Sequence, residues 1–115
     1  MKTENPLKEK SYAFALRIVK LHRHLRSKKE EILARQVLRS GTAIGALTEE
    51  ANQAESKADF IHKLAIANKE ANETLYWLRL LKDSEILEDN LANSLISDCH
   101  ELVKLLAAIL KTSKA

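Results

Sequence analysis

Histidine, cysteine and carboxylate side chains are the first candidates for chemistry in this chain, because they supply metal ligands and acid or base groups. A carboxylate-bridged di-iron site in a helical bundle needs Glu from two helices and a Glu-x-x-His pair from each of two others. The sequence offers one related pair, Asp59-x-x-His62. The His22-x-His24 pair places its rings on different helix faces, and the run 98–100 (Asp-Cys-His) has no second cluster to complete four ligands. We therefore interpret Asp59 as a capping residue and His62 as a surface residue, and we expect no metal site and no cofactor.

Nucleophilic and acid–base catalysis find no better support. Cys99 and His100 are adjacent, and adjacent residues of a helix do not face each other, so Cys99 is predicted to be a core residue. Glu70 and Glu73 lie three residues apart on one helix face, where we expect them to pair with basic residues of a neighbouring helix. As catalytic groups they would need a pocket that the sequence does not show. The chain is therefore predicted not to be an enzyme.

Basic residues are concentrated near the start of the chain. Residues 1–40 hold eleven Lys and Arg against four Asp and Glu, and residues 41–115 hold eight against twelve, so net charges of +7 and −4 make up the overall +3. A basic stripe can follow a phosphate backbone, since each neutralised phosphate releases counterions without any reading of sequence. The alternative is a solvated helix face that binds nothing. The candidate nucleic-acid-binding residues are Arg17, Lys20, Arg23, Arg26, Lys28, Lys29, Arg35 and Arg39.

Long helices must position these side chains. The chain has two Gly and one Pro, and its length suits a single domain over residues 1–115. Asn5 and Pro6 begin a first helix that ends at about residues 25–28, and a second runs from about 29–31 to about 54. Ser56 begins a third helix that ends near Asp83, and a fourth follows the polar segment 83–90. Short connections make successive helices alternate in direction, so the predicted fold is all-α, an antiparallel up-and-down four-helix bundle.

Apolar residues at helical spacing predict the core of this bundle, one seam for each helix. The predicted seams are Phe14, Ile18, Leu21 and Leu25; Leu33, Val37, Ile44, Leu47 and Ala51; Phe60, Leu64, Ala67, Ala71, Leu75 and Leu78; and Leu91, Leu95, Leu102, Leu106 and Ile109.

The first helix carries a second apolar side. Tyr12, Leu16 and Val19 lie on a different side of the helical wheel from the predicted core seam. One bundle core does not need both sides, so this surface predicts a contact between subunits. The alternative is a few apolar residues that are simply exposed to solvent.

Gly41 and Gly45 lie inside the second predicted helix, where each costs about 1 kcal/mol relative to alanine. They make the helix thin, so we expect another helix, of the same or a second subunit, to pack closely against its backbone. Dimerisation in a membrane would need an apolar span that Arg39 and Glu49 interrupt. With no signal segment and a single cysteine, Cys99, the protein is expected in the cytoplasm.

Several short segments resemble a known family: Leu38-Arg39-Ser40, Ile44-Gly45-Ala46, Glu49-Glu50-Ala51, Ser56-Lys57-x-Asp59-Phe60, and the run Ala67 to Leu78 with Glu70, Glu73 and Trp77. The set is similar to the bacterial four-helix-bundle family that includes proteins encoded in intervening sequences of 23S ribosomal RNA genes. This resemblance covers nearly the whole chain and implies a homopentamer. A related branch resembles the accessory protein of diversity-generating retroelements, a basic pentameric barrel that binds nucleic acid and partners a reverse transcriptase.

Two functional hypotheses follow from the residues and the resemblance together. The first is a non-enzymatic, oligomeric nucleic-acid-binding bundle with an RNA-related role and little sequence specificity. The second is a structural or protein-interaction module that assembles through its apolar surfaces and through the helix face that carries Glu70 and Glu73. Reversing the charge of basic residues such as Lys20 separates the two hypotheses, because only the first requires them for binding.

Overall fold

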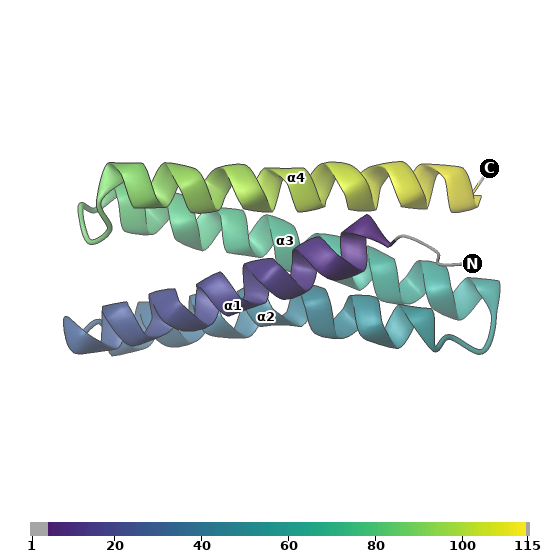
Figure 1. Cartoon of the computed structure of the whole chain (residues 1–115), viewed down its shortest axis with the longest axis horizontal. Coiled ribbons are helices and arrows are strands. Elements are labelled where there is room, and N and C mark those ends of the chain that lie inside the picture. The colour runs from purple at the N-terminus through teal and green to yellow at the C-terminus, as the bar shows by residue number, and fades with distance from the viewer. Residues whose placement is uncertain (1–4, 115) are drawn as a thin grey trace.

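The computed structural model describes residues 5–114 and consists of four helices (Figure 1). They are α1 (Pro6–Ser27), α2 (Glu31–Asn52), α3 (Lys57–Asp83) and α4 (Asp89–Lys114). Within the described part of the chain there is no strand, so the expected all-α fold class with four helices is confirmed. Figure 1 shows the α1–α2 and α3–α4 connections at one end of the molecule and the α2–α3 connection at the other. Residues 1–4 and 115, which the predicted domain includes, lie outside the described residues.

Side-chain caps explain where two of the helices begin. The Asn5 side chain accepts a hydrogen bond of 3.0 Å from the backbone N–H of Lys8, and Pro6 occupies the first helical position. The Ser56 hydroxyl accepts a hydrogen bond of 3.0 Å from the backbone N–H of Asp59 at the start of α3. Each cap satisfies a backbone donor that has no partner within its own helix. Both helix starts predicted from these capping residues are confirmed.

The predicted core seam of α1 is confirmed, whereas each of the other three seams includes residues that are half-buried and pack against the core. These residues are Leu33 and Leu47, Phe60 and Leu75, and Leu91 and Ile109. Phe14, Ile18, Leu21 and Leu25 are all buried. In α3, Leu75 is half-buried and the neighbouring Thr74 is fully buried in its place. The Thr74 hydroxyl is 2.9 Å from the Ser40 hydroxyl and 2.8 Å from the Glu70 carbonyl oxygen, so a polar side chain is satisfied inside the bundle. Hydrophobic spacing alone does not predict such a position.

The two glycines of α2 lie against α1. A methyl group added at Gly41 would be 2.8 Å from Ile18 Cγ1, and one added at Gly45 would be 3.3 Å from the Ser11 carbonyl oxygen. The absence of a side chain at these two positions therefore lets α1 approach the backbone of α2 closely. This close contact lies within a single chain.

Packing between α1 and α4 is the weakest of the four neighbouring helix pairs. Two ion pairs link these helices, Lys10 with Glu101 at 3.0 Å and Arg17 with Asp98 at 2.6 Å. Toward the end of the molecule that carries the α1–α2 connection, α1 and α4 diverge (Figure 1). This divergence leaves part of the basic surface of α1 beside a groove.

Candidate nucleic-acid interface

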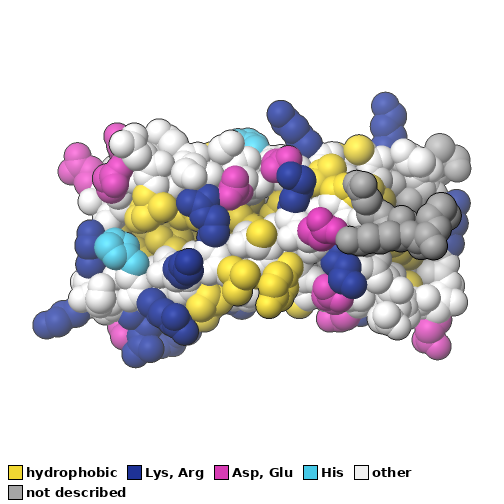
Figure 2. Space-filling view, in the orientation of Figure 1, with side chains coloured by type: hydrophobic (Ala, Val, Ile, Leu, Met, Phe, Trp, Pro, Cys, Tyr) yellow, Lys and Arg dark blue, Asp and Glu magenta, His cyan; other side chains and the backbone are white. Residues whose placement is uncertain are grey.

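The basic residues predicted to bind nucleic acid gather mainly where α1 ends and α2 begins. Arg17, Lys20, Arg23 and Arg26 lie on α1, Arg35 and Arg39 lie on α2, and the connection between the helices supplies Lys28 and Lys29. Lys29 has a φ of 64°, a left-handed conformation that turns the chain sharply from one helix into the next. Figure 2 shows dark blue side chains gathered at this end of the molecule.

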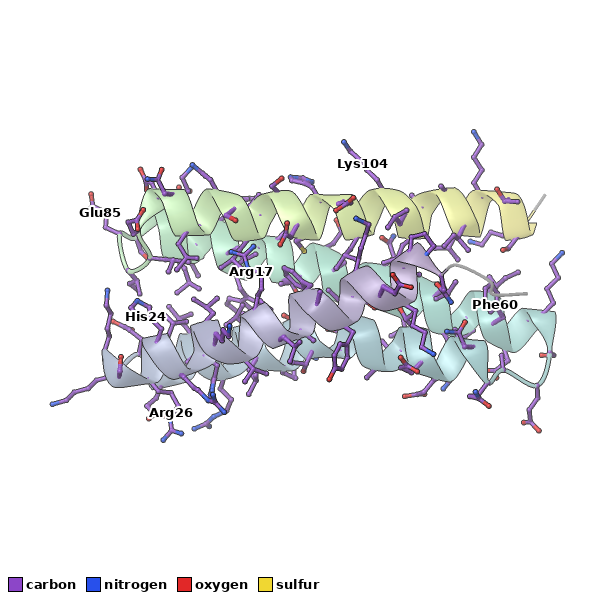
Figure 3. All side chains as sticks on the ribbon, viewed as in Figure 1. Arg17, His24, Arg26, Phe60, Glu85 and Lys104 are labelled. Carbon is purple, nitrogen blue, oxygen red and sulfur yellow. The ribbon has the colours of Figure 1, made fainter. Side chains whose placement is uncertain are left out.

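Three arginines of the predicted set are held in ion pairs, each with a different helix. Arg17 pairs with Asp98 of α4, Arg26 pairs with Glu31 of α2 at 3.2 Å, and Arg39 pairs with glutamates of α3. Figure 3 shows Arg17 on the side of α1 that faces α4, and Arg26 on the opposite side of the same helix. The predicted residues are therefore spread over several sides of the bundle and do not form one continuous face.

The other five predicted residues are exposed and have no ion-pair partner within residues 5–114. They are Lys20, Arg23, Lys28, Lys29 and Arg35. An exposed cation without an internal partner can neutralise a phosphate without first breaking a contact in the protein. We call these five residues the basic end, and they form the strongest candidate surface for a polyanion.

Arg39 belongs to a hydrogen-bonded network with Glu70 and Glu73, the two glutamates that were predicted to pair with a basic residue. Its guanidinium donates hydrogen bonds to Glu70, at 3.2 Å, and to Glu73, while the Trp77 indole N–H donates to Glu73 at 3.0 Å. The expected pairing of the two glutamates with a basic residue of a neighbouring helix is confirmed.

The hydrogen bonds of this network also shift pKa values. Those from Trp77 and Arg39 lower the pKa of Glu73, and those to Glu73 and Glu70 raise the pKa of Arg39. Both partners are thus held in their charged forms. With two carboxylates around one guanidinium, this site is a poorer phosphate contact than the basic end.

The predicted subunit-contact surface on α1 is largely exposed. Tyr12 is 64% exposed and Leu16 is 51% exposed, whereas Val19 is half-buried. The three residues follow one another at helical spacings of four and three, so they share one side of α1.

A second exposed apolar group lies on α2 and α3, and the sequence did not predict it. It consists of Ile32, Tyr76 and Leu80, with exposed fractions of 76%, 50% and 36%. The Tyr76 ring lies edge-on to Trp77 with 5.1 Å between ring centroids, so it packs on its neighbour at the surface instead of entering the core.

The residues considered for chemistry include one buried cysteine. Cys99 is buried, its Sγ lies 3.3 Å from the Ala71 carbonyl oxygen, and burial raises its thiol pKa to about 12. No group of three or more His, Cys, Asp and Glu side chains in residues 5–114 is arranged to hold a metal ion. A search of the same residues finds no helix with the length and hydropathy needed to cross a membrane.

Comparisons with known proteins agree with the sequence resemblance. The model of the 23S rRNA-intervening sequence protein family matches residues 3–108. Among solved structures, the chain is similar to a protein with unknown function from the S23 ribosomal protein family of Bacteroides thetaiotaomicron. The two share 50% sequence identity and superpose with a TM-score of 0.89, over 91% of this chain and 98% of that one. Among curated proteins, no sequence matches this chain.

Proposed function

The chain belongs to the 23S rRNA-intervening sequence protein family, and from this premise we propose that it is a non-enzymatic, oligomeric RNA-binding bundle with little sequence specificity. The observation that carries the proposal is the basic end, five exposed Lys and Arg side chains without acidic partners among residues 5–114. Cations on an exposed surface of this kind contact phosphates and supply affinity that does not depend on base identity. The family name, which refers to ribosomal RNA, favours RNA over DNA as the natural polyanion.

Assembly of several subunits would strengthen such binding. The antiparallel bundle we propose exposes Tyr12 and Leu16 on α1, and Ile32, Tyr76 and Leu80 on α2 and α3. We propose that these two sets act as two different contact surfaces. A closed ring with head-to-tail contacts requires two different surfaces on each subunit. A pentameric ring, as the family resemblance implies, would present five basic ends to one RNA in the cytoplasm and gain avidity from their number. A reverse transcriptase as partner stays a prediction of the resemblance.

RNA-binding measurements with matched charge-reversal variants test the proposal. The first variant combines Lys20→Glu, Arg23→Glu and Lys28→Glu in the basic end. The control combines Lys69→Glu, Lys104→Glu and Lys111→Glu, three exposed lysines of α3 and α4 that also lack an ion-pair partner within residues 5–114. Both variants change the net charge equally, so a difference between them measures position and not total charge.

The expected result is a loss of affinity of at least about tenfold for the basic-end variant and a much smaller loss for the control, measured by fluorescence anisotropy with a mixed-sequence RNA. Light scattering after size exclusion should show the same subunit number for both variants. Absence of RNA binding even at low salt would refute the proposal. If the wild-type protein formed an oligomer that did not bind RNA, the structural-module hypothesis would replace the RNA-binding proposal.

A further inference from the structure

A groove lies beside the basic end, between the diverging halves of α1 and α4. It has a volume of about 380 Å³, which falls within the range of about 300–1,000 Å³ typical of small-molecule sites. Figure 3 shows Arg17 and His24 on the α1 side of this space, and Figure 2 shows an apolar area there that is bordered by blue and cyan side chains. The lining residues are Arg17, Lys20, Leu21, His24, Leu91 and Leu95.

The two walls of the groove differ in chemistry. Its α1 wall carries Arg17, Lys20 and His24 together with the apolar Leu21, whereas α4 contributes only Leu91 and Leu95. Arg17 also forms an ion pair with Asp98 of α4, so part of its charge is already neutralised within the protein. An occupant that fits these walls has negative charge on the α1 side and an apolar surface on the α4 side.

The polar side chains of the α1 wall also lead out of the groove. Lys20, His24 and Lys28 follow one another at four-residue spacing, so they form a row along α1, about 6 Å apart, that ends at the α1–α2 connection. This row joins the groove to the basic end. A chain of phosphates can follow it while a group attached to that chain enters the groove.

We propose that the groove receives an unpaired nucleobase, with the adjoining phosphates lying along Lys20 and Lys28, so that the protein prefers single-stranded RNA to duplex. This inference rests on the RNA binding proposed above. A base in a duplex is stacked and paired and cannot reach the leucines, whereas a base in a single strand is free to turn into an apolar pocket. Phosphate contacts alone give the opposite preference, because a duplex has the higher charge density.

Three RNA probes of equal length test the inference on the wild-type protein. They are a mixed-sequence single strand, the duplex of the same sequence, and a strand that keeps every phosphate but lacks its bases. The expected result is binding of the complete single strand about five- to tenfold tighter than either of the others, the effect of burying one base face on apolar side chains.

A matched pair of variants ties this preference to the groove. Leu91→Gln changes a half-buried groove residue, and Leu105→Gln changes a half-buried residue of α4 that does not line the groove. We expect Leu91→Gln to lose the preference for bases while it binds the baseless strand unchanged, and Leu105→Gln to keep the preference. Circular dichroism verifies that both variants are folded, and the probe comparison on the wild-type protein does not depend on them.

Each outcome separates the inference from the proposed function. Equal binding of complete and baseless strands, or tighter binding of the duplex, overturns the groove inference and leaves RNA binding intact. Failure of all three probes to bind at low salt overturns the proposed function itself. If Leu91→Gln instead changes the subunit number without changing base preference, the groove is a contact between copies of the chain and the inference is wrong.

Discussion

Replacing Gly41 with alanine is expected to destabilise the protein, although alanine is the better helix former. The added methyl group would lie 2.8 Å from Ile18 Cγ1 and 2.9 Å from Ile18 Cγ2. Both atoms are bonded to the Cβ of a fully buried, β-branched side chain. They cannot move away by rotation as the end of a long flexible side chain could. Gly45 offers a comparison in the same helix, because a methyl group there would lie farther from its neighbours, at 3.3 Å from the Ser11 carbonyl oxygen and 3.5 Å from the carbonyl carbon.

The expected magnitude follows from two opposing effects. Alanine in place of glycine favours the helix by about 1 kcal/mol at either position. Overpacking of a tight core costs about 1–3 kcal/mol, and the contact geometry assigns most of this cost to Gly41. Gly41→Ala should therefore be less stable than Gly45→Ala by about 1–3 kcal/mol, a difference from which the helix preference cancels. Gly45→Ala itself should be close to wild type.

Chemical denaturation at fixed protein concentration measures these differences, since the stability of the proposed oligomer would depend on concentration. A double-mutant cycle with Ile18→Ala adds the decisive control. Removal of the Ile18 branches should make Gly41→Ala neutral or stabilising in that background, and should leave the effect of Gly45→Ala unchanged. If Gly41→Ala were as stable as Gly45→Ala in the wild-type background, the close approach of α1 at Ile18 would be refuted.

Two further predictions concern titratable groups. The pKa of Glu73 is lowered in the folded protein, so its contribution to stability is present above the pKa of an unfolded Glu, about 4.3, and is lost as pH falls through the lower folded value. Thermal unfolding of Glu73→Gln should therefore depend less on pH across this window than that of wild type, and emission from Trp77, the single tryptophan of the chain, should report the same titration. An equal pH dependence in both proteins would contradict the Glu73 contacts. The buried thiol of Cys99, with its pKa raised to about 12, should not react with a thiol reagent at pH 8 until the protein unfolds, and rapid reaction of the native protein would show that the contact between α3 and α4 is open.

The sequence predicted where the candidate binding residues lie along the chain but not which of them form ion pairs. Their concentration near the start of the chain was visible in the residue types alone, and α1 and α2 do carry them. Which of them are engaged was not visible, because Arg17 meets a carboxylate 81 residues further along the chain and Arg39 meets one 31 residues further. Pairing over such distances depends on how the helices lie beside one another. The groove between α1 and α4 was missed for the same reason, and Leu91 and Leu95 were predicted only as core residues.

What the sequence determined by itself is local. Helix starts at Asn5 and Ser56 come from side chains that bond to backbone groups three residues away, and the buried seam of α1 comes from the period of the helix. The tertiary structure decided everything that depends on a neighbour: the burial of Thr74 beside Ser40, the divergence of α1 from α4, and the set of cations left without partners. The physical reason is that helical periodicity defines one face of one helix, whereas the environment of that face depends on the position and tilt of the other three.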